Sequence, residues 1–464
     1  MTQIEITPEM TDVQSTGKQV YVETYGCQMN LADTEIVLSV LNKEGFASTD
    51  QIEGADLVLL NTCSIRDNAE QRIHHRLANI AHHKKKNPEL VVGLLGCMAE
   101  RMRKDLLTDD SIVDIVVGPD QYRVLPELVS EARHGEKGLA VKLSRVETYD
   151  DITPMRTEGI SAWISVMRGC DKFCTYCVVP FTRGRERSRS LRSIVDEVKY
   201  LSDHGFREVT LLGQNVNSYL WEGKDFADLL SAAAAVDPLI RIRYTTSHPQ
   251  DMSDKLIETM AEWPNICNYI HLPVQSGSNR VLELMNRTYT VDHYMERIEK
   301  IRELIPDVAL STDIIAGFPT ETEEDHQGTL EVMSRVRYDG AYMFKYSPRE
   351  RTKAWAMGDD VPDEVKTRRL QEIIELQNSI SAEKNQSHLG KTFEVLVEGP
   401  SKRDPLEWKG RTGENHVVIF PRSDVDPGEY INVKVDRATS ATLIGTEVDE
   451  GGRRKVIPLD TLAI

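Results

Sequence analysis

Long hydrophobic runs are missing from this sequence. No apolar stretch approaches the roughly 18–20 residues that a membrane-spanning helix needs, so no membrane contact is expected. Residues 1–17 have neither the basic start nor the apolar segment of a secretory signal, and we interpret them as a polar tail. Together these absences predict a cytoplasmic protein.

Positive charge is also scarce. The chain has 56 Lys and Arg residues against 74 Asp and Glu residues, for a net charge of −18. This balance excludes indiscriminate binding of polyanions, so any nucleic-acid contact must come from local basic patches. With 464 residues the chain is too long for one compact core, and two or three domains are expected.

Cysteines are few, and their number does not suit a disulfide framework. There are seven in all, an odd count spread over a long chain without an export signal. Metal binding or catalysis is therefore the favoured use of these thiols.

Three of the cysteines end β-rich runs in the first part of the chain. "QVYVETYGC", "ADLVLLNTC" and "LVVGLLGC" are each followed by a helix-like stretch, and "DIVVGPDQY" repeats the pattern without a cysteine. Strands that alternate with helices predict a parallel sheet, whose ligands bind at the carboxyl ends of the strands. Cys27, Cys63 and Cys97 should meet at that edge. The alternative is three buried structural cysteines.

Two further segments follow. Six strand candidates separated by helical patterns, from "SAWISVM" to "AYMFKYS", predict an incomplete TIM-like barrel that is open on one side. After a long helical connector, short alternating strands predict a small antiparallel barrel of OB-like type, which either binds RNA or serves as a structural cap. The fold class is therefore α/β with a terminal β-barrel, and the expected domains are 18–145, 155–385 and 388–455.

The central segment opens with three closely spaced thiols. Cys170, Cys174 and Cys177 form the pattern C-x3-C-x2-C directly after the first predicted barrel strand. A structural zinc site needs four ligands, and no fourth Cys or His lies close by. Iron–sulfur clusters are held by thiolates, and three ligands on a [4Fe–4S] cluster leave one iron open for a substrate or cofactor.

This cysteine pattern on an open barrel resembles the radical S-adenosylmethionine superfamily. The resemblance implies that the open iron chelates S-adenosylmethionine and that one electron from the cluster releases a 5′-deoxyadenosyl radical. Tyr176 stands where the superfamily has an aromatic residue beside the adenine. Gln214 and Asn215 replace its usual Gly-Gly-Glu element, while Asp313 and Gly317 lie in a stretch similar to its late-strand element near the adenine. The plainer reading of these last two is a capping residue and a turn glycine.

The three segments together resemble one subgroup, the methylthiotransferases, over about residues 18 to 450. "YGCQMNLADTE", "NTCSIRDNAE", "CTYCVVPFTRGRERSR" and "HLPVQSGS" are similar to the branch that makes 2-methylthio-N6-isopentenyladenosine in the anticodon loop of bacterial tRNA. This implies two [4Fe–4S] clusters: Cys170, Cys174 and Cys177 hold one, and Cys27, Cys63 and Cys97 hold an auxiliary cluster that carries the sulfur. It also implies a terminal TRAM domain and an electron donor such as flavodoxin or ferredoxin.

Basic residues follow the cysteine loop and recur in the terminal barrel. Arginine makes bidentate phosphate contacts, and proteins usually read single-stranded RNA by splaying out its bases. The expected RNA contacts are Arg183, Arg185, Lys402, Arg403, Lys409 and Arg411. For Arg189 and Arg192 a solvated charged turn is an equal alternative.

Two other functions stay open at this stage. One is methylthiolation of a different substrate, either threonylcarbamoyl-adenosine in tRNA or an aspartate of a ribosomal protein. The other is an iron–sulfur RNA-binding protein without chemistry of its own. The seventh cysteine, Cys267, opens a barrel strand and is interpreted as a packing residue.

Overall fold

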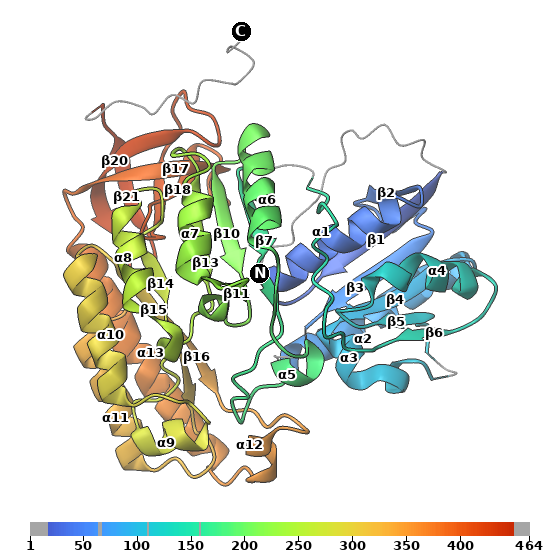
Figure 1. Ribbon diagram of the computed structural model, residues 1–464, viewed down its shortest axis with the longest axis horizontal. Coiled ribbons are helices and arrows are strands. Elements are labelled where there is room, and N and C mark those ends of the chain that lie inside the picture. Colours follow the sequence, from blue (N-terminus) through green and yellow to red (C-terminus); the bar gives the residue numbers. More distant parts are fainter. Residues whose placement is uncertain (1–16, 64–66, 109–110, 157–158, 450–464) are drawn as a thin grey trace.

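The computed structural model describes residues 17–63, 67–108, 111–156 and 159–449, which form three structural units (Figure 1). A parallel sheet with helices lies on one side of the molecule, an open barrel lies beside it, and a small closed barrel sits at one end of the open barrel. Most of the expected polar tail, residues 1–16, and the last residues of the third expected segment, 450–455, lie outside the described residues.

The first unit is a six-stranded, all-parallel sheet, as the repeated strand–helix pattern predicts. Its strand order is β2-β1-β3-β4-β5-β6. The strands are β1 (Lys18–Thr24), β2 (Phe46–Thr49), β3 (Leu57–Thr62), β4 (Val91–Gly96), β5 (Ile115–Val117) and β6 (Gly138–Ala140). The two strands that the sequence pattern did not reveal, β2 and β6, are edge strands of only four and three residues, too short to show a repeat.

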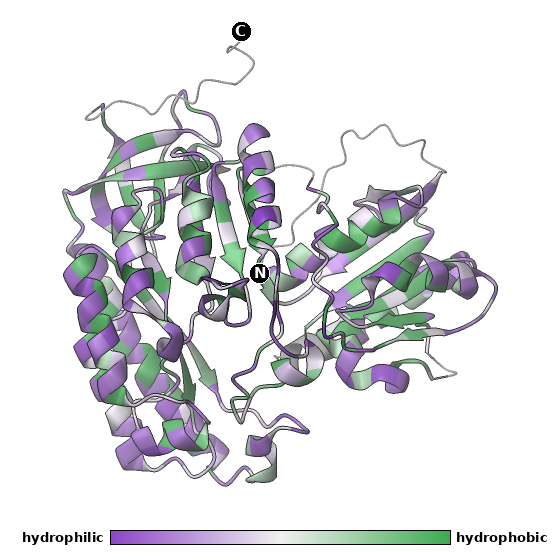
Figure 2. Cartoon of the chain, viewed as in Figure 1, coloured by the Kyte–Doolittle hydropathy of each residue, from purple (hydrophilic) through white to green (hydrophobic). Residues whose placement is uncertain are grey.

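Helices cover both faces of this sheet because alternate strand residues point to opposite sides. Residues of one parity, such as Leu57 and Leu59, pack against α1 (Gln28–Asn42) and α4 (Leu125–Arg133). Residues of the other parity, such as Val58, pack against α2 (Asp67–Lys86) and α3 (Cys97–Met102). Short 3-10 turns, η1 (Arg103–Leu106) and η2 (Tyr122–Val124), complete the unit. Figure 2 shows the strands as predominantly hydrophobic, as burial on both faces requires.

The second unit contains the six predicted barrel strands. They are β7 (Ser161–Ser165), β10 (Glu208–Leu212), β13 (Arg241–Thr245), β14 (Tyr269–His271), β15 (Ala309–Ala316) and β16 (Gly340–Lys345). They form two parallel three-stranded sheets, β13-β10-β7 and β14-β15-β16. A parallel bridge between Ile242 and Ile266 joins the two sheets. Within the described residues β7 and β16 do not pair, so the barrel is open between these two edge strands, as expected.

An outer layer of helices follows the strands of this barrel. Its helices are α6 (Leu191–Asp203), α7 (Phe226–Ala234), α8 (Asp254–Glu262), α9 (Asn279–Leu284), α10 (Val291–Leu304), α11 (Glu323–Val336), α12 (Lys353–Ala356) and α13 (Asp363–Gln386). The short helix α5 (Val179–Thr182) lies instead beside α3 of the first unit (Figure 1). Two 3-10 turns and two small ribbons complete the unit: η3 (Val216–Ser218), η4 (Pro249–Asp251), β8 (Met167–Arg168) with β9 (Arg187–Ser188), and β11 (Leu220–Trp221) with β12 (Lys224–Asp225). Helix α6 shows why these helices can be predicted from the sequence. The Ser190 side chain caps its N-terminus, and the buried Ile194, Val198 and Leu201 recur at helical spacing.

The third unit is a closed five-stranded barrel in the order β17-β18-β19-β21-β20. Its strands are β17 (Thr392–Pro400), β18 (Glu407–Arg411), β19 (Val417–Pro421), β20 (Tyr430–Ala438) and β21 (Leu443–Glu447). The expected small antiparallel barrel is confirmed, with one departure: β19 and β21 pair in parallel. Every other pair is antiparallel, and the parallel pair is what closes the sheet on itself.

The small barrel docks at the amino ends of the central strands. Arg241 Nη1 donates to the carbonyl oxygen of Arg411 at 2.7 Å, and Arg243 Nη2 donates to that of Thr412 at 2.6 Å. Tyr430 Oη donates to the carbonyl oxygen of Leu239 at 2.9 Å. The carboxyl ends of the central strands, where a barrel of this type holds its reactive groups, are thus left to other partners. Among the described residues no helix has both the length and the apolar character to cross a membrane.

Candidate functional site

The central cysteine loop lies at the carboxyl end of the first barrel strand, between β8 and α5. The loop is held by backbone hydrogen bonds from Cys170 N to Gly184 O at 3.1 Å and from Cys177 N to Cys174 O at 3.0 Å. Burial raises the pKa of the Cys177 thiol to about 12, and the nearby Cys174 and Cys170 thiols add to the effect. Three thiols that perturb one another in this way form one group of potential ligands, and metal binding would release their protons.

The sulfur spacing distinguishes between kinds of metal group. Four thiolates around one zinc ion would sit about 3.8 Å apart, given Zn–S distances of about 2.3 Å. In the described part of the chain neither cysteine triplet has all three sulfur atoms within 4.8 Å of one another. The donor set and its spacing therefore fit a larger thiolate-bound group, such as a [4Fe–4S] cluster, better than a single ion.

Unsatisfied polar atoms gather at the carboxyl ends of β10 and β13, next to the cysteine loop. Gln214 Oε1, Asn215 Oδ1, Ser247 Oγ and His248 Nε2 are buried and make no hydrogen bond within the described residues. Buried polar atoms without partners are rare in folded proteins and often mark a ligand site. The two residues expected to bind S-adenosylmethionine, Gln214 and Asn215, belong to this group, so the site fits a polar cofactor.

Aromatic residues border the loop on its other side. Tyr176 packs edge-to-face on Phe318, with ring centroids 6.5 Å apart, and the partly buried Ile315 packs against the same apolar cluster. Gly317 is a turn glycine with φ of +73°, and a Cβ there would lie 2.2 Å from Lys366 Cγ in α13. Asp313 lies inside β15, so it is not a helix cap; its Oδ1 is 3.5 Å from His271 Nε2.

One arginine at this site escaped the sequence analysis. Arg287 is 8% exposed, and its Nη1 donates to Cys174 Sγ at 3.5 Å while Nη2 donates to Pro273 O at 2.9 Å. Burial lowers the pKa of the neighbouring His248 to about 2, and the charge of Arg287 contributes to that shift. No local motif marks Arg287, because it follows a short helix more than a hundred positions after the cysteine loop.

The N-terminal cysteines meet at the carboxyl edge of their sheet, as predicted. Cys27 is the N-cap of α1, Cys63 follows β3, and Cys97 opens α3. Glycines make the close approach possible. A Cβ at Gly26 would lie 2.5 Å from Cys63 Cβ, and one at Gly96 would lie 2.5 Å from Asn61 Oδ1; both glycines have positive φ.

Arg183 corrects an expectation from the sequence. It is 3% exposed, and its Nε donates to Cys97 Sγ at 3.2 Å while Nη2 donates to Asp33 Oδ2 at 2.8 Å and to Asn30 Oδ1 at 2.9 Å. A guanidinium buried between two domains offers no face to an RNA phosphate, so Arg183 is not a surface contact. Its Nη1 is buried and unpartnered within the described residues, which fits a sulfur-rich group held by Cys97 and its neighbours.

Two other arginines of this loop are buried in ion pairs like Arg183, and two are exposed. Arg187 pairs with Asp120 at 2.8 Å and Arg189 pairs with Glu197 at 2.8 Å, both buried. Arg185, by contrast, has a side chain that is 63% exposed; it pairs with Asp171 at 2.9 Å on the surface and lies over the Phe173 ring. Arg192 is also exposed.

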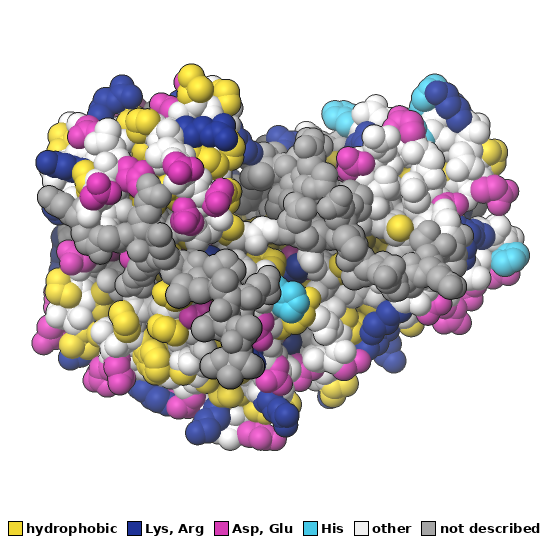
Figure 3. All heavy atoms as spheres, turned by 90° about the horizontal axis from the view of Figure 1, so that it is seen from above, with side chains coloured by type: hydrophobic (Ala, Val, Ile, Leu, Met, Phe, Trp, Pro, Cys, Tyr) yellow, Lys and Arg dark blue, Asp and Glu magenta, His cyan; other side chains and the backbone are white. Residues whose placement is uncertain are grey.

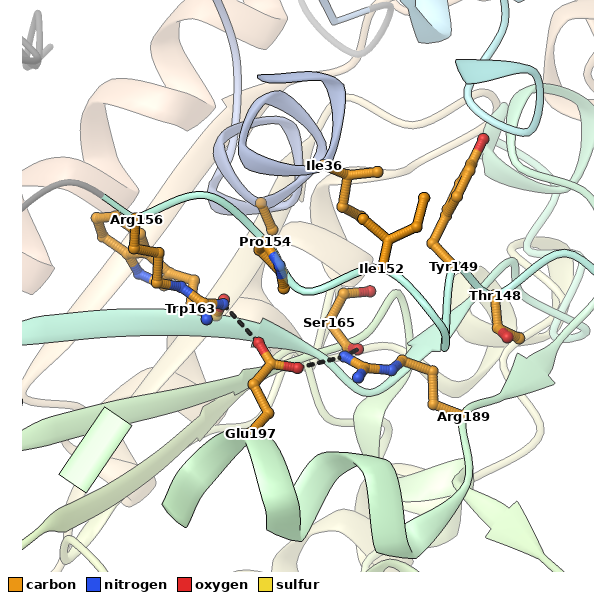
Figure 4. Close-up of a pocket in the computed structure, with 11 residues that line it drawn as sticks. Ile36, Thr148, Tyr149, Ile152, Pro154, Arg156, Trp163, Ser165, Arg189 and Glu197 are labelled. Carbon is orange, nitrogen blue, oxygen red and sulfur yellow. Dashed lines mark hydrogen bonds and ion pairs between the residues drawn. The ribbon is translucent and has the colours of Figure 1, made fainter. Parts of the chain in front are cut away.

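A pocket between the first two units is lined by buried arginine–glutamate ion pairs. Figure 4 shows Arg156 and Arg189 pointing at Glu197 from opposite sides, with Ile36 and Ile152 above them. The Arg156–Glu197 distance is 2.6 Å. This pocket joins α1 to β7 and α6 and has the chemistry of a domain interface, not of a reaction site.

The four basic residues of the terminal barrel that were expected to contact RNA differ in exposure and pairing. Lys402 and Arg403 are exposed at one loop. Lys409 and Arg411 are instead ion-paired with Glu398, at 2.5 and 2.8 Å. Figure 3 shows Lys and Arg side chains interspersed with Asp and Glu on the face seen from above, so this face is not a continuous basic surface.

Fold and site together define a radical S-adenosylmethionine enzyme with a second cysteine-bearing domain. Residues 164–333 match the family model described as the radical SAM superfamily. Residues 19–118 match the uncharacterized protein family UPF0004, and residues 386–448 match the TRAM domain.

Full-length relatives narrow this class. A protein of Chloroherpeton thalassium is 54% identical over 444 residues, which cover 94% of this chain and 98% of the relative. A protein of Bacteroides thetaiotaomicron is 54% identical over 440 residues, covering 93% and 96%. Both are named tRNA-2-methylthio-N(6)-dimethylallyladenosine synthase. The chain belongs to this family of radical S-adenosylmethionine methylthiotransferases.

Solved structures share the fold at low sequence identity. The methyltransferase TsrM from Kitasatospora setae, solved with cobalamin and a [4Fe–4S] cluster, is 15% identical, with a TM-score of 0.57 over 73% of this chain and 77% of that one. The cobalamin-dependent radical enzyme OxsB is 11% identical, with a TM-score of 0.53 over 78% of this chain and 56% of that one. These likenesses confirm the expected fold class.

Proposed function

We propose that this enzyme attaches a methylthio group to carbon 2 of N6-dimethylallyladenosine, also called N6-isopentenyladenosine, next to the anticodon of tRNA. The names of its full-length relatives support this substrate. The observation that carries the proposal is the position of the two cysteine triplets. Both lie at carboxyl ends of parallel strands, and Arg183, six residues after Cys177, reaches Cys97 of the other triplet.

In this proposal each triplet holds one [4Fe–4S] cluster. Cys170, Cys174 and Cys177 bind the cluster that works with S-adenosylmethionine, and Cys27, Cys63 and Cys97 bind the auxiliary cluster. When bound, these groups supply the methyl group, the sulfur and the one-electron chemistry that an unreactive aryl C–H bond requires.

The chain's own residues orient the cluster ligands and bind S-adenosylmethionine. Arg287 and Arg183 donate N–H groups to Cys174 and Cys97, which steadies the ligand sulfurs. Gln214, Asn215 and Ser247 present unsatisfied oxygens to the polar groups of S-adenosylmethionine. Tyr176 and Phe318 supply an apolar wall for its adenine.

Domain boundaries and partners complete the proposal. We assign 18–145 to the auxiliary-cluster domain, 155–385 to the radical domain and 388–455 to the TRAM domain. Lys402 and Arg403 are the exposed basic side chains that we assign to RNA phosphates in the terminal barrel. Near the cysteine loop we assign Arg185, which is 63% exposed and would exchange its surface pair with Asp171 for a phosphate. A small reductant such as flavodoxin or ferredoxin delivers the electron, and the enzyme works in the cytoplasm.

Anaerobic turnover tests this function. The reconstituted enzyme is mixed with S-adenosylmethionine, dithionite and isopentenylated tRNA, and the nucleosides are analysed by mass spectrometry. We expect 2-methylthio-N6-isopentenyladenosine together with 5′-deoxyadenosine. Cleavage of S-adenosylmethionine without a modified nucleoside would point to a different substrate, and no cleavage at all would point to a non-catalytic protein.

A further inference from the structure

Two large aromatic side chains stand exposed on the edge strand of the open barrel. Tyr342 is 56% exposed and Phe344 is 38% exposed, both on β16. Within the described residues β16 pairs only with β15, so it borders the opening of the barrel. Rings of this size are normally buried, and their exposure at a reaction barrel calls for a partner.

The sheet geometry directs both rings into the barrel. Met343, between them, packs into the core shared with Ile373 of α13, which covers the outer face of β16. Neighbouring strand residues point to opposite faces, so Tyr342 and Phe344 point inward. The ring contact between Tyr342 and His271, with centroids 5.7 Å apart, agrees with this direction.

Polar groups lie at the same level of the barrel wall. Asp313 is the register partner of Tyr342, and its carboxylate is 3.5 Å from His271 Nε2. The other ring nitrogen of His271 is 2.9 Å from Ser311 Oγ. An imidazole and a carboxylate beside exposed rings can hydrogen-bond the edge of a base while the rings contact its face.

The wall continues to the cysteine loop. Phe344 is the register partner of Ile315. Ile315 and Tyr176 pack against the same small apolar cluster, which contains Phe318, and Tyr176 stands between Cys174 and Cys177. A planar group on Tyr342 and Phe344 would therefore lie along the same inner surface as the proposed reaction centre.

The spacing of the two rings suits a nucleobase. Residues two apart on a strand are separated by about 6.6 Å. Stacked bases are separated by about 3.4 Å, so one planar base fits between two side chains at this spacing.

We propose that Tyr342 and Phe344 form the stacking site for the target adenine, with His271 and Asp313 at its edge. This inference rests on the proposed function and extends it to the residues that select the base. It also moves Asp313 from the cofactor, where the sequence resemblance put it, to the substrate.

The site is tested by measuring how tightly wild-type and variant enzymes bind two RNAs, one with the target base and one without it. The probe is an anticodon stem-loop RNA with N6-isopentenyladenosine at the target position, compared with the same RNA carrying an abasic site there. The variant Tyr342→Leu/Phe344→Leu keeps apolar bulk on the strand but removes both rings. Tyr342→Phe keeps the ring, and Tyr200→Leu removes an exposed tyrosine from the outer face of α6.

Loss of stacking should weaken binding of the intact RNA by about 5- to 100-fold in the double variant. Binding of the abasic RNA should be equal for wild type and double variant, because the base that the rings would contact is missing. Tyr342→Phe and Tyr200→Leu should both bind the intact RNA like wild type. Iron content and RNA-independent cleavage of S-adenosylmethionine, measured on each variant, report intact folding.

Two results would overturn the inference. One is a double variant that still prefers intact over abasic RNA as strongly as wild type does. The other is an 8-azidoadenine at the target position that cross-links wild-type enzyme only outside the wall formed by β14, β15 and β16. A failure of the proposed function looks different: wild-type enzyme would then bind the RNA without methylthiolating it, whatever the variants do.

Discussion

Arg183 donates Nε–H to Cys97 Sγ over 3.2 Å, from the loop of the radical domain to the edge of the N-terminal sheet. The same guanidinium pairs with Asp33, which also accepts from Arg168 Nη1 at 2.8 Å. Asp33, Arg168 and Arg183 are all almost fully buried. The contact thus joins the two cysteine sites through one interdomain ion-pair network.

Arg183→Ala should destabilise the protein strongly. It leaves the buried Asp33 with one cation and removes a donor from Cys97, which by analogy with other broken buried pairs costs about 3–5 kcal/mol. Denaturant unfolding of the metal-free protein measures this. Arg185→Ala, two positions away and largely exposed, is the matched control and should change stability by less than about 0.5 kcal/mol. Equal effects of the two substitutions would contradict the network.

Gly96→Ala should impair the auxiliary site beyond the cost of backbone strain. Its φ is +88° and the added Cβ would meet Asn61 and Thr62 at 2.5 and 2.6 Å. Gly54→Ala has nearly the same φ, +85°, with nothing within 4 Å, so it isolates the cost of strain, about 1 kcal/mol. We expect Gly96→Ala, but not Gly54→Ala, to lower iron bound at the auxiliary site. Full iron in Gly96→Ala would show that this close approach is dispensable.

Each cysteine triplet should account for half of the bound iron. Reconstituted protein should hold about eight irons, in two four-iron clusters. Replacing Cys170, Cys174 and Cys177 by alanine should leave about four, and so should replacing Cys27, Cys63 and Cys97. Cys267→Ala should keep all of them, because Cys267 is a buried residue at the amino end of β14, beside Arg243. Iron and sulfide assays on each reconstituted variant measure these contents. Iron lost from Cys267→Ala would reveal a ligand outside the two triplets.

Removal of residues 388–464 should spare both clusters and uncoupled cleavage of S-adenosylmethionine but raise the apparent KM for tRNA. All six proposed ligands precede the cut, and the terminal barrel docks at the opposite end of the central strands. An unchanged KM would make the terminal barrel a structural cap.

Within the terminal barrel, Lys402→Ala/Arg403→Ala should weaken tRNA binding and lower the salt slope by about two. Lys409→Ala should have a smaller effect, because Lys409 is held by Glu398. Binding titrations at several salt concentrations measure both. A salt slope unchanged in the double variant would exclude this loop from phosphate contact.

Much of the fold was predictable because its signals are local. The six barrel strands are short runs rich in β-branched, aromatic and other apolar residues between stretches with helical periodicity, and each appears where the sequence pattern puts it. Short edge strands such as β2 and β6 were missed because three or four residues carry little pattern. The parallel pair β19–β21 was missed for another reason: pairing direction depends on how the barrel closes, which no single strand records.

In the candidate site, too, the residues with a local sequence signal were predicted and those defined by distant contacts were not. Local spacing identified Cys170, Cys174 and Cys177, and the equivalence of strand ends identified Cys27, Cys63 and Cys97. Arg287 was invisible because its contact with Cys174 spans more than a hundred positions. Arg183 was visible but misread as a phosphate contact, since its sequence neighbours do not include the Asp33 that neutralises it.

The sequence by itself determined the chemistry available to this protein: two thiol triplets, strands to carry them to sheet edges, and a family of relatives. Only the tertiary structure decided which charges are buried and which stay at the surface. Arg183 and Arg187 are buried in ion pairs between domains and Arg189 is buried in an ion pair with Glu197 of α6, whereas Arg185 is 63% exposed, although all four alternate within seven positions. Tyr342 and Phe344 are left uncovered in the same way, at the edge where the barrel fails to close. The physical reason is that burial and pairing depend on contacts between distant segments, and those contacts exist only once the domains have packed.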